Sequence, residues 1–166
     1  YIAAQYGHVE VVTALLDGGA DANKATNGGA TSLYIAAQEG HTAVVTALLD
    51  AGADVNKAQE DGCTPLYIAA QFGHTAVITA LLDADAKIEV ENEHGSTPLL
   101  AAAFHRKNEA TKILLRAGAD VDKAIAVAEK HNDIATIKLI TTLQTKIEKE
   151  AAAQAPEINQ MVVHIR

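Results

Sequence analysis

The apolar positions of the chain repeat at a fixed interval. Leucine pairs recur every 33 residues, at Leu15-Leu16, Leu48-Leu49, Leu81-Leu82 and Leu114-Leu115. In the third copy the apolar residues at 77, 78, 81 and 82 follow the i, i+1, i+4, i+5 spacing of one helix face. This pattern predicts a helix over roughly residues 75–83, and one helix of the same kind in every copy.

An alanine-rich segment precedes each leucine-pair helix and predicts a first helix in each copy. In the third copy Thr64 suits an N-cap, Pro65 suits the first helical position, and Gly73 suits a left-handed helix end. Turn-forming residues at 52–56 and 61–62 predict a hairpin-like excursion between copies. Two helices of about two turns each are unstable alone. We therefore expect successive copies to stack and bury their apolar faces, as in a solenoid.

The repeated motif resembles the ankyrin repeat. Residues 62–70 read Gly-Cys-Thr-Pro-Leu-Tyr-Ile-Ala-Ala, with Tyr67 where the family usually has His, and the Gly-His and Leu-Leu-x-x-Gly-Ala-Asp elements recur. The resemblance covers roughly residues 1–140. It implies an all-α ankyrin-repeat solenoid of stacked helix-turn-helix units with short projecting β-hairpins.

The repeat pattern divides the chain into five units and an extension. We expect an ankyrin repeat domain over 1–140, with units 1–25 (partial), 26–58, 59–91, 92–123 and 124–140 (a truncated cap). Residues 141–166 form a C-terminal helix extension and tail, in which Pro156 is expected to end the helix. Because the first residues fall inside a motif, we expect that the true N-terminus is missing.

Two positions depart from glycines of the sister copies. Asp85 stands where other copies have Gly, and Arg106-Lys107 stands where they have Gly-His. If these backbones are left-handed, the larger side chains impose strain.

Charge and composition exclude several function classes. The net charge is −8, which argues against a general nucleic-acid binder, because such binders neutralise phosphates with Lys and Arg. Residues 1–83 carry two Lys against nine acidic residues, whereas residues 84–166 carry eleven Lys and Arg against twelve. This asymmetry favours a partner with a basic surface. One cysteine excludes a disulfide framework, and no apolar run is long enough to span a bilayer. We expect a monomer in the cytoplasm, or in the host cytoplasm if the protein is a secreted effector.

No pattern in the chain indicates catalysis, a metal site or a cofactor. His8, His41 and His74 repeat at the same place, but stacked repeats lie about 8–10 Å apart, too far to share one zinc ion. We interpret them as residues that cap the turn between the two helices. Gly28-Gly29 does not lead into a phosphate-binding sequence.

The expected function is a non-catalytic protein–protein interaction scaffold. The resemblance implies that a partner binds the hairpin tips and the concave first-helix surface, where the copies vary while the framework repeats. The candidate partner-binding residues are Tyr6, Asn27, Gln38, Glu39, Glu60, Asp61, Cys63, Gln71, Phe72, Glu93, His94, Phe104 and His105. Phe72, Phe104 and Tyr6 are the expected anchors, since large aromatic residues dominate interface hot spots.

Two alternatives remain open from the sequence. The chain is a targeting module of a larger enzyme, such as a bacterial effector, or it is an adaptor between membrane proteins and a cytoskeleton. A longer reading frame would settle whether the chain is part of a larger enzyme. A longer array of repeats before Tyr1 would favour the adaptor.

Overall fold

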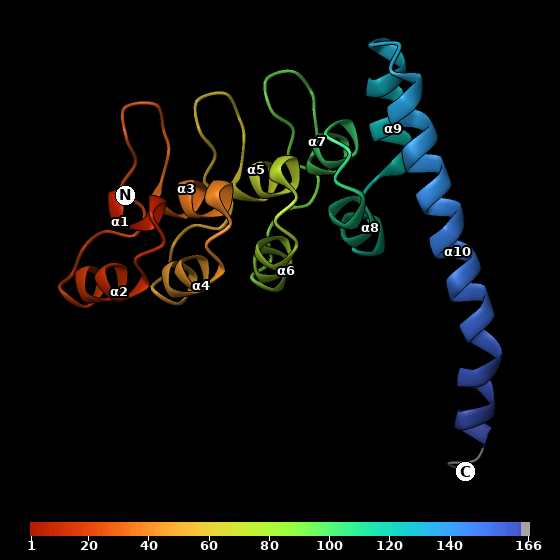
Figure 1. Ribbon diagram of the computed structural model, residues 1–166, viewed down its shortest axis with the longest axis horizontal. Coiled ribbons are helices and arrows are strands. Elements are labelled where there is room, and N and C mark those ends of the chain that lie inside the picture. Colours follow the sequence, from red (N-terminus) through yellow and green to blue (C-terminus); the bar gives the residue numbers. More distant parts are fainter. Residues whose placement is uncertain (164–166) are drawn as a thin grey trace.

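Helix pairs stacked side by side build the molecule, and a long C-terminal helix closes one end (Figure 1). A computed structural model describes the backbone of residues 1–163 and the side-chain environments of residues 1–154. The helices are α1 (Ile2–Gln5), α2 (Val9–Asp17), α3 (Ser32–Glu39), α4 (Thr42–Asp50), α5 (Pro65–Phe72), α6 (Thr75–Asp83), α7 (Pro98–Phe104), α8 (Asn108–Arg116), α9 (Val121–Lys130) and α10 (Ile134–Val163). No strand occurs among residues 1–163, so the fold is the all-α solenoid expected from the sequence.

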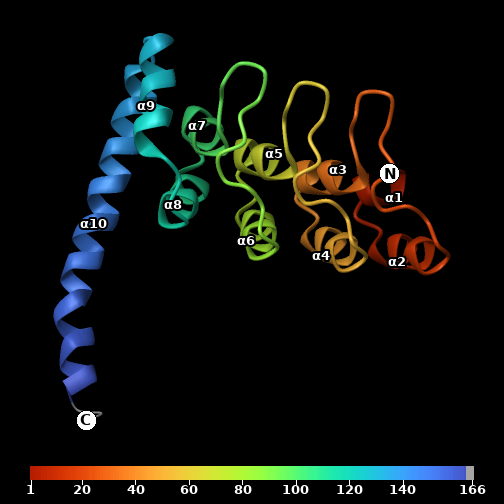
Figure 2. The same cartoon turned by 180° about the vertical axis from the view of Figure 1, so that it is seen from behind.

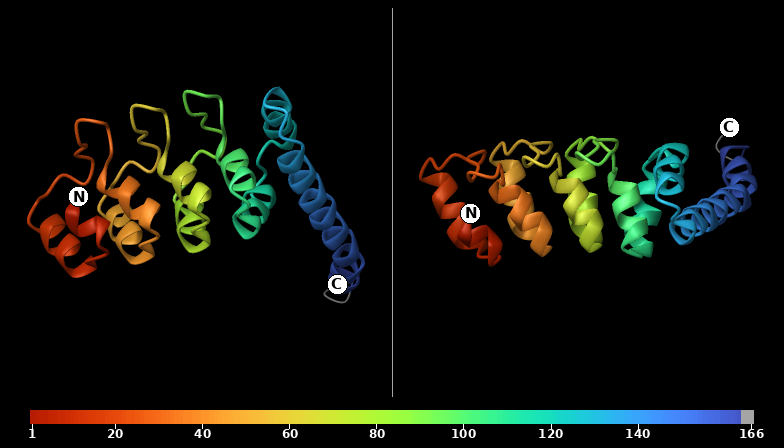
Figure 3. Two further views of the ribbon diagram at one scale, coloured as in Figure 1. Left: turned by 45° about the horizontal axis from the view of Figure 1, so that its top comes forward. Right: turned by 90° about the horizontal axis from the view of Figure 1, so that it is seen from above.

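The helices form two rows, with the loops above the first row (Figure 2). Helices α1, α3, α5 and α7 make one row and contact each other in that order, and α2, α4, α6 and α8 make the other. Seen from above, successive helix pairs lie side by side and run in similar directions (Figure 3). The first helix of each pair packs closely because its alanine pair is fully buried, as at Ala69-Ala70 and Ala102-Ala103.

Threonine caps start three of the first-row helices in the same way. Thr31, Thr64 and Thr97 are buried, and the hydroxyl of each accepts a hydrogen bond from the backbone N–H three residues later, at 3.1–3.3 Å. These caps satisfy helix N–H groups that have no partner inside the helix. The N-cap predicted at Thr64 is therefore confirmed.

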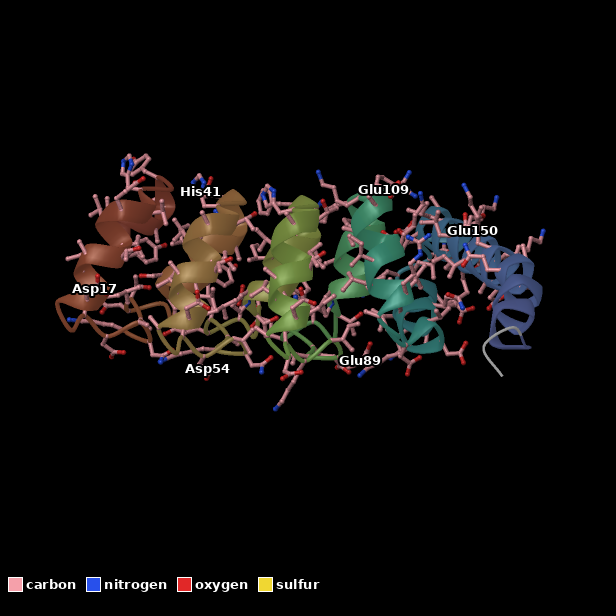
Figure 4. All side chains as sticks on the ribbon, turned by 90° about the horizontal axis from the view of Figure 1, so that it is seen from below. Asp17, His41, Asp54, Glu89, Glu109 and Glu150 are labelled. Atoms are coloured by element: carbon pink, nitrogen blue, oxygen red, sulfur yellow. The ribbon has the colours of Figure 1, made fainter. Side chains whose placement is uncertain are left out.

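Two ladders of hydrogen bonds tie neighbouring repeats together along opposite edges of the stack (Figure 4). At the edge that contains His41, the Nε2 of His41 donates to the Gln5 carbonyl at 2.9 Å, and that of His74 donates to the Gln38 carbonyl at 2.8 Å. At the edge that contains Asp54 and Glu89, Asn23 accepts from the Asp54 N–H at 2.6 Å. The sequence predicted that these histidines cap the inter-helix turn; His41 and His74 bond to the carbonyl end of the first helix in the preceding repeat.

The loops between repeats project as turns rather than regular β-hairpins. In the first of them, Thr26 N–H donates to Ala30 O at 2.9 Å and Gly29 N–H donates to Thr26 O at 3.0 Å. The other two loops, at 59–63 and 92–96, repeat these bonds. Neighbouring tips are also joined, since Glu93 N–H donates to Asp61 O at 2.8 Å.

The C-terminal end is closed by a shortened unit. Helix α9 contacts α7 in the first row, and α10 packs on α7, α8 and α9. Helix α10 does not end at Pro156, as the sequence suggested, but continues to Val163. A proline removes one backbone donor and costs about 3 kcal/mol in a helix interior, yet α10 continues through this position. Residues 164–166 of the predicted tail lie outside the described residues.

Candidate functional site

The candidate site begins with the residues that end the first-row helices. Each follows an alanine pair: Gln5-Tyr6 at the end of α1, Gln38-Glu39 in α3 and Gln71-Phe72 in α5. Helix α7 ends at Phe104, which is the equivalent of Gln71, and His105 follows as the equivalent of Phe72. Tyr6, Phe72 and Phe104 are 65%, 46% and 59% exposed, which is unusual for residues of this size.

Each of these three aromatic side chains lies next to a histidine ring. Phe72 stacks on His74 with ring centroids 6.2 Å apart and planes 8° apart. Phe104 meets His105 edge-on at 5.2 Å, and Tyr6 lies 6.3 Å from His8. Aromatic contacts of this kind limit the rotamers of the exposed rings. The His74 ring is itself fixed by its bond to Gln38 O, so Phe72 is held by an ordered neighbour.

The loop tips add polar groups to the same surface. Asn27, Glu60, Glu93 and His94 are exposed. Asp61 is half-buried, and its Oδ1 accepts the Cys63 N–H at 2.9 Å. Glu39 is exposed and its carboxylate accepts a hydrogen bond from the Gln38 amide at 3.0 Å. The surface therefore presents acidic groups between its aromatic residues.

Cys63 does not lie on this surface, although the sequence placed it there. It is buried, and burial raises the pKa of its thiol to about 11. Its Sγ lies 3.8 Å from the Asn92 amide nitrogen of the next loop. A buried, protonated thiol packs neighbouring loops together and is not available to a partner.

A groove of about 380 Å³ opens between α5, α7, α9 and the third loop. Its apolar wall is formed by Leu100, Ala101, Phe104, Val127 and Ala128, and its polar wall is formed by Tyr67, Gln71, Asn92, His94, Ser96, His105, His131 and Asp133. The groove brings together four of the predicted site residues, which come from α5, α7 and the third loop: Gln71, His94, Phe104 and His105.

Hydrogen bonds fix the polar wall of the groove. The Asn92 amide donates to the Tyr67 hydroxyl at 3.2 Å, and that hydroxyl lies 3.5 Å from the Ser96 Oγ. Burial raises the pKa of the Tyr67 hydroxyl, so this group stays protonated and can donate. Asn92 also accepts the N–H groups of His94 and Ser96 at 3.0 and 2.9 Å. The wall is thus ordered before any partner arrives.

Sequence reasoning missed the contribution of α9 to the groove. Val127, Ala128 and His131 lie on this helix, which contacts α7 in the first-helix row. The signal was available, because the truncated unit was recognised at residues 124–140 and its first helix must lie beside α7. The other predicted residues do not line the groove. Glu93 lies in the third loop beside it, and the rest lie in the earlier repeats: Tyr6, Asn27, Gln38, Glu39, Glu60, Asp61, Cys63 and Phe72.

The described part of the chain shows no cluster suited to a metal ion. Among these residues no group of three or more His, Cys, Asp and Glu side chains lies close enough to bind one. No described helix is both long and apolar enough to cross a membrane.

A family model described as ankyrin repeats (3 copies) matches residues 1–59 and 53–125. A search of curated proteins gave no match. Ankyrin repeats are generally protein–protein interaction modules, typically without catalysis of their own, which implies a protein partner. The 33-residue step, the Thr caps and the two rows of helices agree with this match, and the chain belongs to the ankyrin-repeat family.

Proposed function

We propose that this chain is a non-catalytic scaffold that binds a partner protein on one surface, called here the recognition surface. The recognition surface consists of the loop-tip and first-helix residues Tyr6, Asn27, Gln38, Glu39, Glu60, Asp61, Gln71, Phe72, Glu93, His94, Phe104 and His105. It omits Cys63 because that residue is buried.

The proposal rests on the difference between the buried framework residues, which are the same in each repeat, and the exposed surface residues, which vary. The framework residues Leu33, Leu66 and Leu99 are identical and 0–1% exposed. At the helix ends, by contrast, Tyr6, Glu39 and Phe72 differ although they occupy equivalent, exposed positions. Residues that serve only to hold the stack have no reason to place large aromatic rings in water. A binding role accounts for both their exposure and their variation.

The groove is the part of the recognition surface best suited to an anchor. Its volume of about 380 Å³ accommodates a large apolar side chain, and Phe104 and Leu100 supply the apolar contact. Tyr67 and Asn92 supply ordered hydrogen-bonding groups beside it. We infer that the partner inserts one apolar side chain here and makes polar contacts at the rim.

Charge indicates the chemistry of the partner. The recognition surface includes Glu39, Glu60, Asp61 and Glu93 but neither Lys nor Arg. A partner with Lys and Arg around its apolar anchor is therefore complementary to it.

Site-specific photo-crosslinking tests this function. A photoreactive phenylalanine analogue replaces Phe104, and the matched control places it at Thr79, which is exposed on second-row helix α6. The proposal expects a specific protein to be captured from Phe104 and not from Thr79, and expects that protein to lose affinity for the Phe104→Ala variant. Capture mainly from Thr79 would show that the partner uses the other side of the stack.

A further inference from the structure

The three loops between repeats are bonded to one another in a fixed register. Glu60 N–H of the second loop donates to Gly28 O of the first at 3.3 Å, and Glu93 N–H of the third loop donates to Asp61 O of the second at 2.8 Å. The two donors are equivalent positions of the 33-residue repeat, and so are the two acceptors. Each of the first two loops therefore offers a backbone carbonyl to the loop that follows it.

The third loop is followed by a helix instead of a fourth loop. The Asp120 carboxylate accepts the Lys123 N–H at 2.9 Å and caps α9, which follows the third loop with no further loop between them (Figure 1). The carbonyl equivalent to Gly28 O and Asp61 O is His94 O, and no other residue within 1–154 donates a hydrogen bond to it. The series of loop-to-loop bonds thus ends at an open acceptor.

The glycines of the loops show the same difference. A Cβ placed on Gly62 would lie 3.0 Å from the Asn92 Cα of the next loop, and Gly29 has similarly close backbone contacts with the second loop, at 3.1–3.3 Å. A Cβ placed on Gly95, by contrast, would meet within 4 Å only the Glu91 carboxylate of its own loop among the described residues. The backbone surface that the first two loops use for their neighbour is therefore uncovered on the third.

The groove between α5, α7, α9 and the third loop lies on this uncovered side. Ser96 lines the groove and is half-buried, whereas its equivalents Ala30 and Cys63 are buried. Leu100 and Phe104 form the apolar wall beside Ser96, and α9 forms the far side. A segment that binds along the third loop is thus also in reach of the apolar wall.

We propose that a turn segment of the partner protein occupies the place of the missing fourth loop. A backbone N–H of the turn donates to His94 O, its backbone packs on Gly95, and one of its side chains enters the groove beside Leu100. Backbone hydrogen bonds of this kind supply affinity, and the groove supplies specificity. The exposed carboxylate of Glu93 favours a turn that carries Lys or Arg. This inference rests on the proposed function, because it names the kind of segment that the recognition surface binds.

A cyclic peptide with the sequence of residues 24–31 is the probe for this site. It carries the first loop, in which Thr26 N–H donates to Ala30 O at 2.9 Å, and it contains one Lys and no acidic residue. Its Asn27 N–H is the equivalent of the donors in the two loop-to-loop bonds. The matched control peptide is N-methylated at Asn27, which removes that donor and changes no side chain. NMR titration of the isotope-labelled 166-residue chain measures the binding of each peptide.

The proposal expects the unmodified peptide to shift the amide signals of Gly95, Ser96 and Phe104. The N-methylated peptide should bind roughly fivefold more weakly or worse, because one hydrogen bond is lost. In the chain, Gly95→Asn should weaken the unmodified peptide by a similar factor, since Asn tolerates the left-handed backbone but its side chain occupies the contact surface. Gly52→Asn is the matched control and should leave binding unchanged, because nothing lies within 4 Å of a Cβ at that left-handed position.

Three results would overturn this proposal: no binding, equal binding of the two peptides, or signal shifts confined to other parts of the chain. Self-association of the 166-residue chain that Gly95→Asn abolishes would also overturn it, in favour of a loop from a second copy. The photo-crosslinking experiment tests the proposed function separately. Capture of a partner from Phe104 combined with equal binding of the two peptides would leave the scaffold function intact and refute only the turn segment.

Discussion

Among residues 1–163, three residues other than glycine hold a left-handed backbone in turns of this solenoid. They are Asp85, Arg106 and Asn132, with φ values of 60°, 58° and 54°. Asp85 is the equivalent of Gly52, and Arg106 is the equivalent of Gly73, which have φ values of 81°. The sequence left the backbone conformation of the first two positions open, and the structure shows that both are left-handed. The turns kept their backbone geometry although the residue changed.

Replacing Asp85 by glycine should stabilise the protein. Asp85→Gly removes the side-chain strain of the left-handed conformation and should raise the free energy of unfolding by about 0.5–1 kcal/mol. Arg106→Gly should gain less, because Arg106 Nη1 donates to Ala135 O at 3.0 Å and that bond is lost. Urea denaturation of both variants measures the difference. A larger gain from Arg106→Gly would contradict this ranking.

The start of α10 depends on one carboxylate. Asp133 Oδ1 accepts the Thr136 N–H at 3.1 Å, and its Oδ2 accepts the Thr136 hydroxyl. These bonds, together with the nearby Arg106 charge, lower the pKa of Asp133 despite partial burial. The carboxylate is thus a helix cap that favours its charged form.

Loss of this cap should produce a pH-dependent change in stability. At neutral pH Asp133→Ala should cost about 1 kcal/mol. The pKa of Asp133 is lower in the folded than in the unfolded protein. Wild type should therefore be more stable than Asp133→Ala above pH about 3.9, the ordinary pKa of Asp. This difference in the free energy of unfolding disappears as the pH falls through the pKa of Asp133 in the folded state. Asp133→Asn is the matched control, since it can cap the helix but does not titrate. Unfolding curves from pH 2 to 7 check the prediction, and a pH-independent gap between wild type and Asp133→Ala would contradict it.

At the scale of the elements, each repeat covers the helix turn of the one before it. A Cβ placed on Gly40 would lie 2.6 Å from the His74 Nδ1, and one on Gly7 would lie 2.7 Å from the His41 Nδ1. In the fourth unit, Lys107 takes the place of this histidine, and its aliphatic stem lies over Gly73. The glycine is therefore required by the neighbouring repeat as well as by its own backbone.

Two glycine substitutions separate the cost of the left-handed backbone from the cost of the contact with the neighbouring repeat. Gly40 and Gly52 have nearly the same φ, 79° and 81°, but nothing lies within 4 Å of a Cβ placed on Gly52. Gly52→Ala should cost about 1 kcal/mol from backbone strain. Gly40→Ala should cost at least about 1 kcal/mol more, because the His74 ring must move and its bond to Gln38 O weakens. Thermal or urea unfolding compares the two, and equal costs would show that the His74 contact contributes little.

The elements also show where sequence reasoning reached its limit. The repeat period and the caps predicted helices α1 to α8 well, because identical residues recur in identical places. The same Asp of the Gly-Ala-Asp motif, however, acts in two ways. Asp54 accepts the N–H of Asn56 in a turn, whereas Asp120 accepts the N–H of Lys123 and caps α9. Only the residues that follow decide between a loop and a helix, so neither the start of α9 nor its place in the groove follows from the motif alone.

Other features were not predicted because contacts between repeats do not follow from the sequence of a single repeat. The bond from His74 to Gln38 O joins residues 36 positions apart, and Cys63 is buried by the next loop through Asn92. Within a single unit both residues look free. The other twelve candidate residues are exposed or half-buried, and their role in binding stays a prediction.

At the scale of the whole molecule, the charge is uneven along the stack. The acidic residues of the recognition surface come from the second, third and fourth units, whose tips are joined by bonds such as Glu60 N–H to Gly28 O at 3.3 Å. Acidic groups presented by three successive repeats attract a basic partner before contact is made. Exposed charges of this kind act mainly on the rate of association.

Salt should therefore weaken binding through the association rate. Glu60→Gln should lower the association rate constant several-fold at low ionic strength, and the difference should shrink once the Debye length falls below about 8 Å. Stopped-flow or surface plasmon resonance measurements at two salt concentrations check this. The matched control is Asp50→Asn at the exposed end of α4. Equal effects of the two variants would show that only net charge matters.

The affinity of the partner for aromatic-deletion variants tests the central claim most directly. Isothermal titration calorimetry compares wild type, Phe104→Ala, Phe72→Ala and the control Thr79→Ala, all at exposed positions. The account predicts a loss of at least about 1–2 kcal/mol for one or both Phe variants, as for a buried aromatic anchor, and an unchanged affinity for Thr79→Ala. A sensitive Thr79 with both Phe variants silent would place the partner on the other face of the solenoid and contradict the account.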